Sequence, residues 1–179
     1  MEYINPVLET ICTRRSVRDF TEQAIEREKL DWILKAGIHA PSGKNMQSWQ
    51  FTVLTSPQTI QDFKHLIRNT LKRTKTGVLM GYNRPDKVII VSNRRDNYNA
   101  VADGACAIEN MLLAASSMGI GGCWINGLRT IYDEPEIRDQ LTKFRIPENH
   151  LIVGMVVLGY PAVVKEGLKK KDDVIQVVE

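Results

Sequence analysis

The residues of this chain best suited to bind an anion occur first at positions 13–18, which read TRRSVR. Three guanidinium groups and two hydroxyl groups fall within these six residues. Arginine carries permanently charged, planar donors that bind phosphate oxygens two at a time, and serine adds a short donor for the same oxygens. The run lies between an apolar-periodic segment and a turn-like stretch at 19–21, so it predicts a connecting loop, where binding residues tend to lie. A solvated basic linker is the alternative, and these six residues alone favour it.

A second polar stretch, residues 40–49 (APSGKNMQSW), combines turn formers, two amides, a lysine and an aromatic residue. A surface loop is the default interpretation. The stretch leads directly into residues 50–54 (QFTVL), whose β-branched and aromatic residues predict a strand. Polar groups at such a helix–strand junction are well placed for ligand contact.

Glycines flank a short apolar run at residues 120–127 (IGGCWING), which predicts a short strand ending at Asn126-Gly127. Glycine also lets backbone N–H groups approach a ligand closely. Further on, residues 165–171 are basic, and residues 174–178 (VIQVV) predict a strand without a hairpin partner nearby. An unpaired apolar strand is a liability unless another sheet edge receives it.

Composition restricts the class of protein. With 179 residues and 43% hydrophobic content, the chain is long enough for one well-buried core. The net charge, 24 basic minus 21 acidic residues or +3, does not favour a nucleic-acid binder. The three cysteines form no CxxC pair and predict reduced thiols in a cytoplasmic protein, with no disulfide framework and no metal site. We expect no secretory signal and no membrane span, because the start lacks a basic region and no apolar run is long enough.

Periodicity and capping residues predict the elements that position these stretches. Asn5-Pro6 and Ser56-Pro57 are typical helix starts, and Asp133 with Glu136 predicts a capping box. Apolar residues spaced three and four apart, together with these caps, predict helices that begin near residues 5, 26, 56, 99 and 133. Strands are predicted at 50–54, 87–92, 120–126 and 151–158, and residues 74–86 form a connection or lid without a clear period.

The segment 99–118 is the most apolar long helix of the chain, with apolar residues nearly all round it. We therefore expect it to be buried on most sides. Its many small residues would allow another helix to approach closely, so it is either the core of the monomer or part of a dimer interface. Gly119 is a suitable cap for its C-terminus.

Four segments in order resemble the nitroreductase family of FMN-dependent enzymes in its short-chain form. They are RRSVRDF, APSGKNMQSWQF, GACAIENMLLAASSMGIGGCWI, and LGYP with a lysine cluster behind it. The resemblance implies a single domain over residues 1–179 with an α+β fold, a nitroreductase-like mixed β-sheet flanked by helices. It also implies an obligate homodimer with FMN at the interface and a C-terminal arm exchanged with the partner.

The resemblance also assigns roles to individual residues. It implies that Arg14, Arg15 and Ser16 hold the FMN phosphate and ribityl chain, and that Arg18 lies at the flavin pyrimidine edge, where its charge would stabilise the anionic reduced flavin. The remaining residues implied to line the flavin or complete the phosphate site are Pro41, Ser42, Asn45, Gln47, Trp124, Ile125, Asn126, Gly127, Lys169, Lys170 and Lys171. The first four are expected from the second subunit. Ser48 stands where the family often has proline, which predicts a less rigid loop.

The implied reaction has two half-reactions with ping-pong kinetics: NADH or NADPH passes a hydride to flavin N5, and the flavin then reduces a nitroaromatic, quinone or similar small acceptor. No side-chain nucleophile is needed, and we expect the three histidines and three cysteines to be structural or exposed. The alternatives are a specialised relative, such as a reductive dehalogenase or a flavin-fragmenting enzyme, and a flavin-binding protein without physiological turnover. A third alternative is a phosphate-binding domain that binds no flavin.

Overall fold

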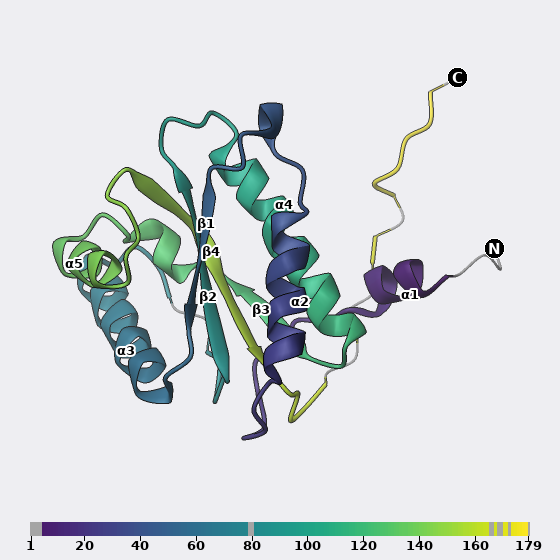
Figure 1. Ribbon diagram of the computed structural model, residues 1–179, viewed down its shortest axis with the longest axis horizontal. Coiled ribbons are helices and arrows are strands. Elements are labelled where there is room, and N and C mark those ends of the chain that lie inside the picture. The colour runs from purple at the N-terminus through teal and green to yellow at the C-terminus, as the bar shows by residue number, and fades with distance from the viewer. Residues whose placement is uncertain (1–4, 79–80, 165–166, 168–169, 172, 179) are drawn as a thin grey trace.

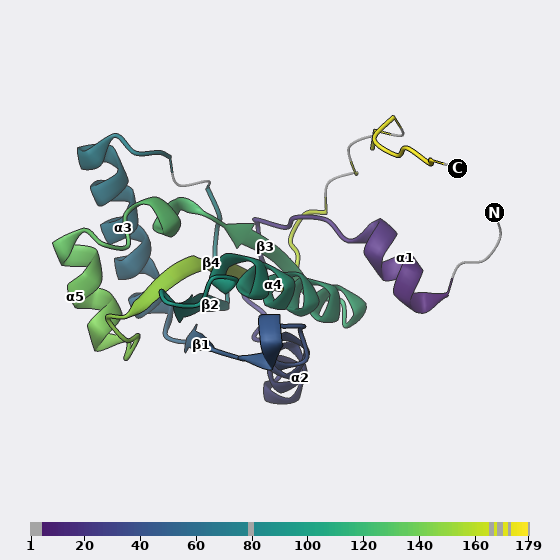
Figure 2. The same cartoon turned by 90° about the horizontal axis from the view of Figure 1, so that it is seen from above.

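The protein is built on one antiparallel β-sheet with helices on both faces (Figures 1 and 2). The computed structural model describes residues 5–78, 81–164, 167, 170–171 and 173–178. The sheet has four strands in the order β1-β2-β4-β3. Their bounds are β1 Trp49–Leu54, β2 Lys87–Arg94, β3 Gly121–Ile125 and β4 His150–Gly159. All three strand pairs are antiparallel, so the parallel part of the mixed sheet expected from the resemblance is limited, in the described residues, to two isolated bridges, Ser16–Gly122 and Asp19–Asn83.

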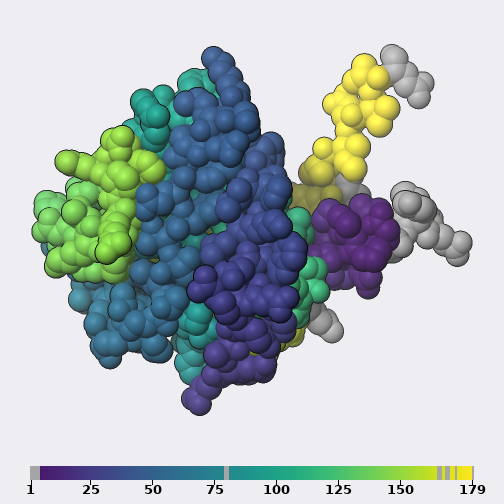
Figure 3. Space-filling model, viewed as in Figure 1, coloured from purple at the N-terminus to yellow at the C-terminus, as the bar shows by residue number. Residues whose placement is uncertain are grey.

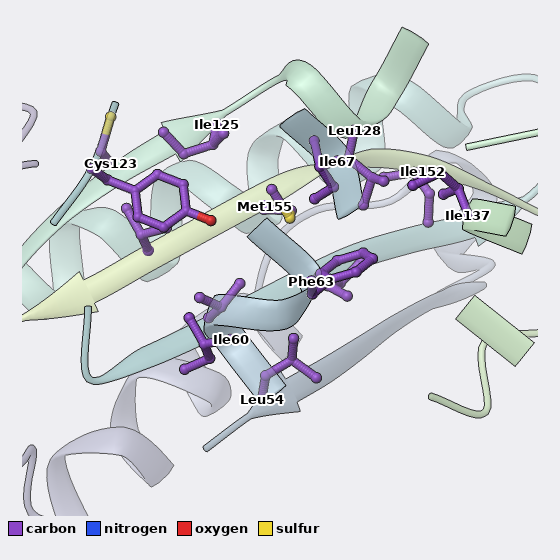
Figure 4. Close-up of a cluster of buried hydrophobic side chains, with 14 of the residues drawn as sticks. Leu54, Ile60, Phe63, Ile67, Cys123, Ile125, Leu128, Ile137, Ile152 and Met155 are labelled. Atoms are coloured by element: carbon purple, nitrogen blue, oxygen red, sulfur yellow. The ribbon is translucent and has the colours of Figure 1, made fainter. Parts of the chain in front are cut away.

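Helices α2 (Arg27–Ile38) and α4 (Ala100–Ser117) cover one face of the sheet, and α3 (Pro57–Thr74) and α5 (Pro135–Lys143) cover the other (Figure 2). Side chains alternate along β2 and β4, because successive residues of a strand point to opposite faces. Val88 and Ile90 pack into the core under α3 and α5, whereas Ile89 and Val91 pack under α2 and α4. Figure 4 shows the first of these cores, which includes Phe63 and Ile67 of α3 and Met155 of β4. Burial on both faces explains why the central strands are continuously apolar.

Capping residues set the helix starts largely as predicted. The Asn5 side chain accepts hydrogen bonds from the amides of Val7 and Leu8 at the start of α1 (Pro6–Thr13), and Ser56 caps α3 through the amide of Thr59. Gly119 follows α4 with a φ of +75°, a left-handed conformation that glycine adopts at little cost. The helices and strands therefore lie within a few residues of their predicted positions.

The predicted capping box at Asp133 is wrong. Helix α5 begins at Pro135 with Glu134 at its N-cap, and no side chain caps it. The Asp133 carboxylate instead accepts hydrogen bonds from the guanidinium groups of Arg95 and Arg138. Glu136 accepts hydrogen bonds from Thr70 and Arg73 of α3. Asp133 and Glu136 therefore make charge-assisted hydrogen bonds to other elements in place of a local cap, because such bonds are stronger than those between neutral groups.

The ends of the chain differ most from expectation. Helix α1 has an apolar stripe, but none of its residues is buried. Residues 174–178 form no strand, and their four apolar side chains are exposed. Figure 3 shows α1 at the margin of the molecule and the described C-terminal residues extending away from its body. Within the described residues, the chain thus leaves apolar surface at both ends uncovered.

None of the helices in the described parts of the chain combines the length and the apolar character needed to cross a membrane. Helix α4 is less completely buried than its composition predicts. Val101, Ala102 and Cys106 are exposed on one side, while Gly104, Ala107 and Met111 are buried on the other. The helix therefore packs on the sheet with one face and presents a second apolar face outward.

Candidate functional site

The basic segment 14–18 runs alongside the edge strand β3. Ser16 and Gly122 form a parallel bridge, in which the amide of Val17 donates to the carbonyl oxygen of Gly122 at 2.9 Å. The pairing fixes an extended backbone, so successive side chains point to opposite sides of the segment. The predicted connecting loop is therefore held against the sheet, and its arginines are presented from a defined backbone.

Two hollows open beside this segment. The first has a volume of about 180 Å³ and lies between Arg14, Arg15 and the glycine-rich turn Gly119–Gly122, with Pro161 and Val164 at its margin. The second, of about 390 Å³, is lined by Ser16, Arg18, Asp19, Gly81, Asn83 and Val163. The four polar residues that the resemblance assigns to this segment are thus divided between two adjoining spaces.

The three guanidinium groups of the segment differ in how they are satisfied. Arg14 donates from Nε to Glu109 of α4 at 3.2 Å. Arg15 donates from Nη1 to the carbonyl oxygens of Cys12 and Arg14, at 2.9 and 2.8 Å. The Nε atom of Arg18 is buried and has no hydrogen-bond partner among the described residues. A buried donor without an acceptor is costly, so the Nε–H group of Arg18 is available to donate a hydrogen bond to an oxygen atom of a ligand.

The second predicted stretch forms a tight, strained loop after α2. Its centre is the short 3₁₀ helix η1 (Gly43–Asn45), and Lys44, Asn45 and Gln47 have φ values of 53°, 54° and 46°. A left-handed conformation costs a residue other than glycine roughly 1–2 kcal/mol, with asparagine the more tolerant type. Pro41, Asn45 and Gln47 are exposed, whereas Ser42 is half-buried and accepts the amide of Gln47 at 3.2 Å. The loop therefore presents Asn45 and Gln47 to solvent from a constrained backbone.

Ser48, which the sequence predicted to leave the loop less rigid, is hydrogen-bonded to two side chains outside the loop. Its hydroxyl group donates to Asn93 Oδ1 at 2.7 Å and accepts from Asn97 Nδ2 at 2.9 Å. These hydrogen bonds tie the end of the loop to β2 and to the turn that precedes α4, in the position where a proline ring would restrict the backbone.

The loop and the basic segment lie at different places along α4 (Figure 1). The amide of Gly43 donates to Asp103 in the first turn of α4, whereas the hollow beside Arg14 reaches Ser116 in the last turn. At 1.5 Å per residue, these positions are roughly 20 Å apart along the helix. One copy of the chain therefore does not bring the two predicted sets of residues together.

The residues predicted from β3 have different environments. Ile125 is fully buried in the core under α3 and α5, so its side chain is unavailable to a ligand. Trp124 is half-buried on the opposite face, against Gly154, where a Cβ atom would come within 2.2 Å of the indole Nε1. This Nε1 is buried without a hydrogen-bond partner in the described part of the chain. Asn126 is exposed, and Gly127 begins the 3₁₀ helix η2 (Gly127–Thr130).

The C-terminal lysines are only partly placed. Lys170 and Lys171 are exposed, and Lys169 lies outside the described residues. Cys123 is buried, and this burial raises the pKa of its thiol, although the nearby Arg18 charge opposes the shift. A buried thiol of this kind is a poor nucleophile, in agreement with a site that needs no cysteine.

Sequence reasoning missed Glu109 and Asp103, the two acidic residues of α4 that contact the candidate stretches. Both lie in an apolar, small-residue helix, where an acidic residue gives no sign of its partner. Their role could have been suspected only from the cost of placing a charge on a helix predicted to be largely buried.

Comparison with known proteins defines the class. The sequence model of the nitroreductase family matches residues 11–160 of this chain. A nitroreductase from Bacteroides fragilis, crystallised with bound FMN, is 38% identical and superposes with a TM-score of 0.91 over 98% of this chain and 100% of that chain. The NADPH-flavin oxidoreductase of Vibrio harveyi is 30% identical over 167 residues, which are 88% of this chain and 67% of the relative. The FMN reductase (NADPH) of Bacillus subtilis is 26% identical over 172 residues, which are 89% of this chain and 67% of the relative. This chain therefore belongs to the nitroreductase family.

Proposed function

We propose that this protein is a homodimeric, FMN-dependent NAD(P)H oxidoreductase that reduces a nitroaromatic, a quinone or a similar small acceptor. The observation that carries the proposal is the hollow between Arg14, Arg15 and the Gly119–Gly122 turn, in a chain 38% identical to a nitroreductase that binds FMN. Bidentate arginine donors beside a glycine-rich turn are a suitable environment for a phosphate group.

The residues present fit FMN in their chemistry. Arg14, Arg15 and Ser16 would hold the phosphate and ribityl chain, and Lys170 and Lys171, which are exposed, would add positive charge. The buried Nε of Arg18 lacks an acceptor among the described residues and would gain one at the pyrimidine edge of the flavin. When bound, FMN supplies the redox chemistry, accepting two electrons from NADH or NADPH and passing them to the acceptor in alternating half-reactions. The positive charge of Arg18 would favour the reduced form by stabilising its negative charge.

A second copy of the chain would complete the site. A two-fold axis perpendicular to α4 places the first turn of one α4 opposite the last turns of its partner. It would thereby bring the loop of one subunit, with Pro41, Ser42, Asn45 and Gln47, to the basic segment of the other. The separation of the two sets along α4 in one copy supports this arrangement.

The first test is the colour of the purified protein. We expect a yellow protein that releases FMN on denaturation, sediments as a dimer, and oxidises NADH or NADPH when a quinone or a nitroaromatic is added. A colourless protein that cannot be reconstituted with FMN would overturn the proposal. A yellow protein that oxidises neither nucleotide with any acceptor would instead be a flavin-binding protein without turnover.

A further inference from the structure

A buried polar network joins the strained loop 42–48 to the start of α4, and one carboxylate lies at its centre. Asp103 Oδ1 accepts the amide of Gly43 at 3.0 Å, where the loop begins. Asp103 Oδ2 accepts Asn97 Nδ2 at 3.0 Å, and the same Nδ2 donates to Ser48 Oγ at 2.9 Å, where the loop ends. The two oxygens of one side chain are therefore connected to both ends of the loop, Oδ1 directly and Oδ2 through Asn97.

The network is buried and well connected. Asp103 and Asn97 are each 4% exposed, and Asn93, which accepts from Ser48, is fully buried. Asn93 Nδ2 in turn donates to the carbonyl oxygen of Ala100 at 3.0 Å, which fixes the network to the first residue of α4. Buried networks in which each member has its partners are rigid, and the loss of one member leaves others unsatisfied.

The loop needs such a restraint because its backbone is strained. Lys44, Asn45 and Gln47 all have left-handed backbones, and their side chains are exposed, so little packing holds them in place. Gly43 lies so close to α4 that a Cβ atom would come within 2.1 Å of Asn99 Nδ2. Residues in such conformations persist only where the surroundings over-determine them, and they cluster at functional sites.

We propose that Asp103 is a positioning residue that holds loop 42–48 in its strained form, so that Asn45 and Gln47 are presented to the flavin of the partner subunit. The flavin part of this inference rests on the proposed function. The restraint of the loop by Asp103 does not, and it can be measured without any cofactor.

Trypsin provides that measurement, because Lys44 is exposed within the loop and Lys64 is buried in α3. Cleavage after Lys44 requires only opening of the loop, whereas cleavage after Lys64 requires wider unfolding. In Asp103→Asn, we expect the ratio of cleavage after Lys44 to cleavage after Lys64 to rise about tenfold, since a hydrogen-bonded charge is lost. The exposed Asp62 of α3 supplies the control, and Asp62→Asn should leave the ratio unchanged.

Exchange of the two partners tests the contact itself. In Asp103→Asn combined with Asn97→Asp, the amide and the carboxylate change places, so we expect most of the wild-type ratio to return. If Asp103→Asn does not fold, Ser48→Ala removes only the link at the end of the loop and should raise the same ratio. Equal acceleration at both lysines would mean that Asp103 stabilises the whole fold, and the proposal would be overturned.

FMN titration of the same variants tests the flavin part. We expect Asp103→Asn to raise the dissociation constant of FMN about tenfold, and the exchanged pair to lower it again. An unchanged affinity in a variant whose loop is demonstrably looser would separate the loop from the flavin and overturn that part. If the wild-type protein binds no FMN, the proposed function fails, while the cleavage ratio still decides the role of Asp103.

Discussion

The guanidinium group of Arg14 pairs with the carboxylate of Glu109 at 3.2 Å, and the proposed FMN phosphate would compete with that carboxylate for it. We expect Arg14→Ala to raise the dissociation constant of FMN by roughly ten- to a hundredfold, because a charge-assisted hydrogen bond to phosphate contributes about 1.5–3 kcal/mol. Glu109→Gln should tighten binding modestly, since a neutral amide no longer competes for Arg14. Fluorescence titration with FMN measures both.

Arg27 offers a matched control for that titration, because it pairs with Asp31 on the exposed side of α2. Arg27→Ala removes one positive charge elsewhere and should leave FMN affinity unchanged. If Arg14→Ala binds FMN as tightly as Arg27→Ala does, the segment 14–18 is a basic linker and the phosphate site lies elsewhere.

His150 makes the stability of the fold depend on pH. Burial, followed by the positive charges of Arg94 and Arg138, lowers the pKa of His150 below its ordinary value of 6.5, and the carboxylate of Asp96 opposes this only in part. As the pH falls below about 6.5, His150 therefore binds a proton in the unfolded chain before it does so in the folded chain. The contribution of neutral His150 to the free energy of unfolding is thus complete above about pH 6.5 and is lost as the pH falls from there to the lowered pKa of the folded chain.

We expect the melting temperature of the wild-type protein to fall more between pH 7.5 and pH 5.5 than that of His150→Asn. Asparagine keeps a hydrogen-bonding group near Ser92 Oγ, the 3.0 Å partner of His150 Nδ1, but cannot take up the proton. His65→Asn, on the exposed surface of α3, should follow the wild type. Identical pH dependence in wild type and His150→Asn would refute the assignment.

At the scale of elements, the contact between α4 and β4 depends on a missing side chain. A Cβ atom at Gly104 would lie 2.6 Å from Cγ2 and 3.0 Å from Cβ of Val153. Alanine is intrinsically better in a helix than glycine by about 1 kcal/mol, yet we expect Gly104→Ala to destabilise the protein by about 1–3 kcal/mol, because α4 would have to move off the sheet.

Urea unfolding of Gly104→Ala against Ala102→Gly separates these two effects. Ala102 is exposed on the same helix, so Ala102→Gly reports helix propensity without the clash and should cost about 1 kcal/mol. If Gly104→Ala proves as stable as the wild type, helix α4 does not pack on β4 as closely as the structure indicates.

Elements with a repeating pattern were predictable from the sequence, and contacts between elements were not. The stripe Ile60, Phe63, Ile67 and Leu71 predicts the buried face of α3, and all four residues are buried. Tyr82 is buried too, yet it lies in a segment without a period, beneath the ammonium group of Lys64. Nothing local indicates that contact, because it arises from tertiary packing.

The candidate site follows the same division. The sequence indicated which stretches are polar and where their backbone turns, since arginine, glycine and asparagine have distinct chemistry and conformational preferences. The sequence did not indicate that Asp103 accepts the amide of Gly43, that Ile125 is turned into the core, or that the buried Nε of Arg18 has no hydrogen-bond partner among the described residues. Each of these depends on which face of an element meets which neighbour.

At the scale of the whole molecule, apolar surface is exposed along one side. Val7, Leu8 and Ile11 of α1 are exposed, as is Val101 of α4, and α1 stands beside the C-terminal residues at the margin of the fold (Figure 2). A monomer rarely leaves that much apolar surface to water, and a large exposed patch commonly marks an interface. The proposed dimer would cover it with a second copy of the same surface.

The C-terminal tail gives the most direct test of this assembly. Val174, Ile175, Val177 and Val178 are between 71% and 84% exposed in the single chain. Pairing with an edge of the partner's sheet would bury these side chains and would give the backbone groups of the tail hydrogen-bond partners. We therefore expect deletion of residues 172–179 to loosen the dimer and to lower FMN occupancy, although Lys170 and Lys171 remain.

A second variant distinguishes the apolar side chains from the length of the tail. Replacement of Val174, Ile175, Val177 and Val178 by serine keeps the length and the preceding lysines, but removes the apolar surface that burial on the partner would stabilise. Sedimentation at several protein concentrations and the ratio of flavin to protein absorbance should change in the same direction in both variants. If the deletion stays dimeric and fully yellow, the tail takes no part in assembly. If the deletion loosens the dimer while the serine variant sediments as the wild type does, backbone pairing and not apolar burial holds the tail to the partner.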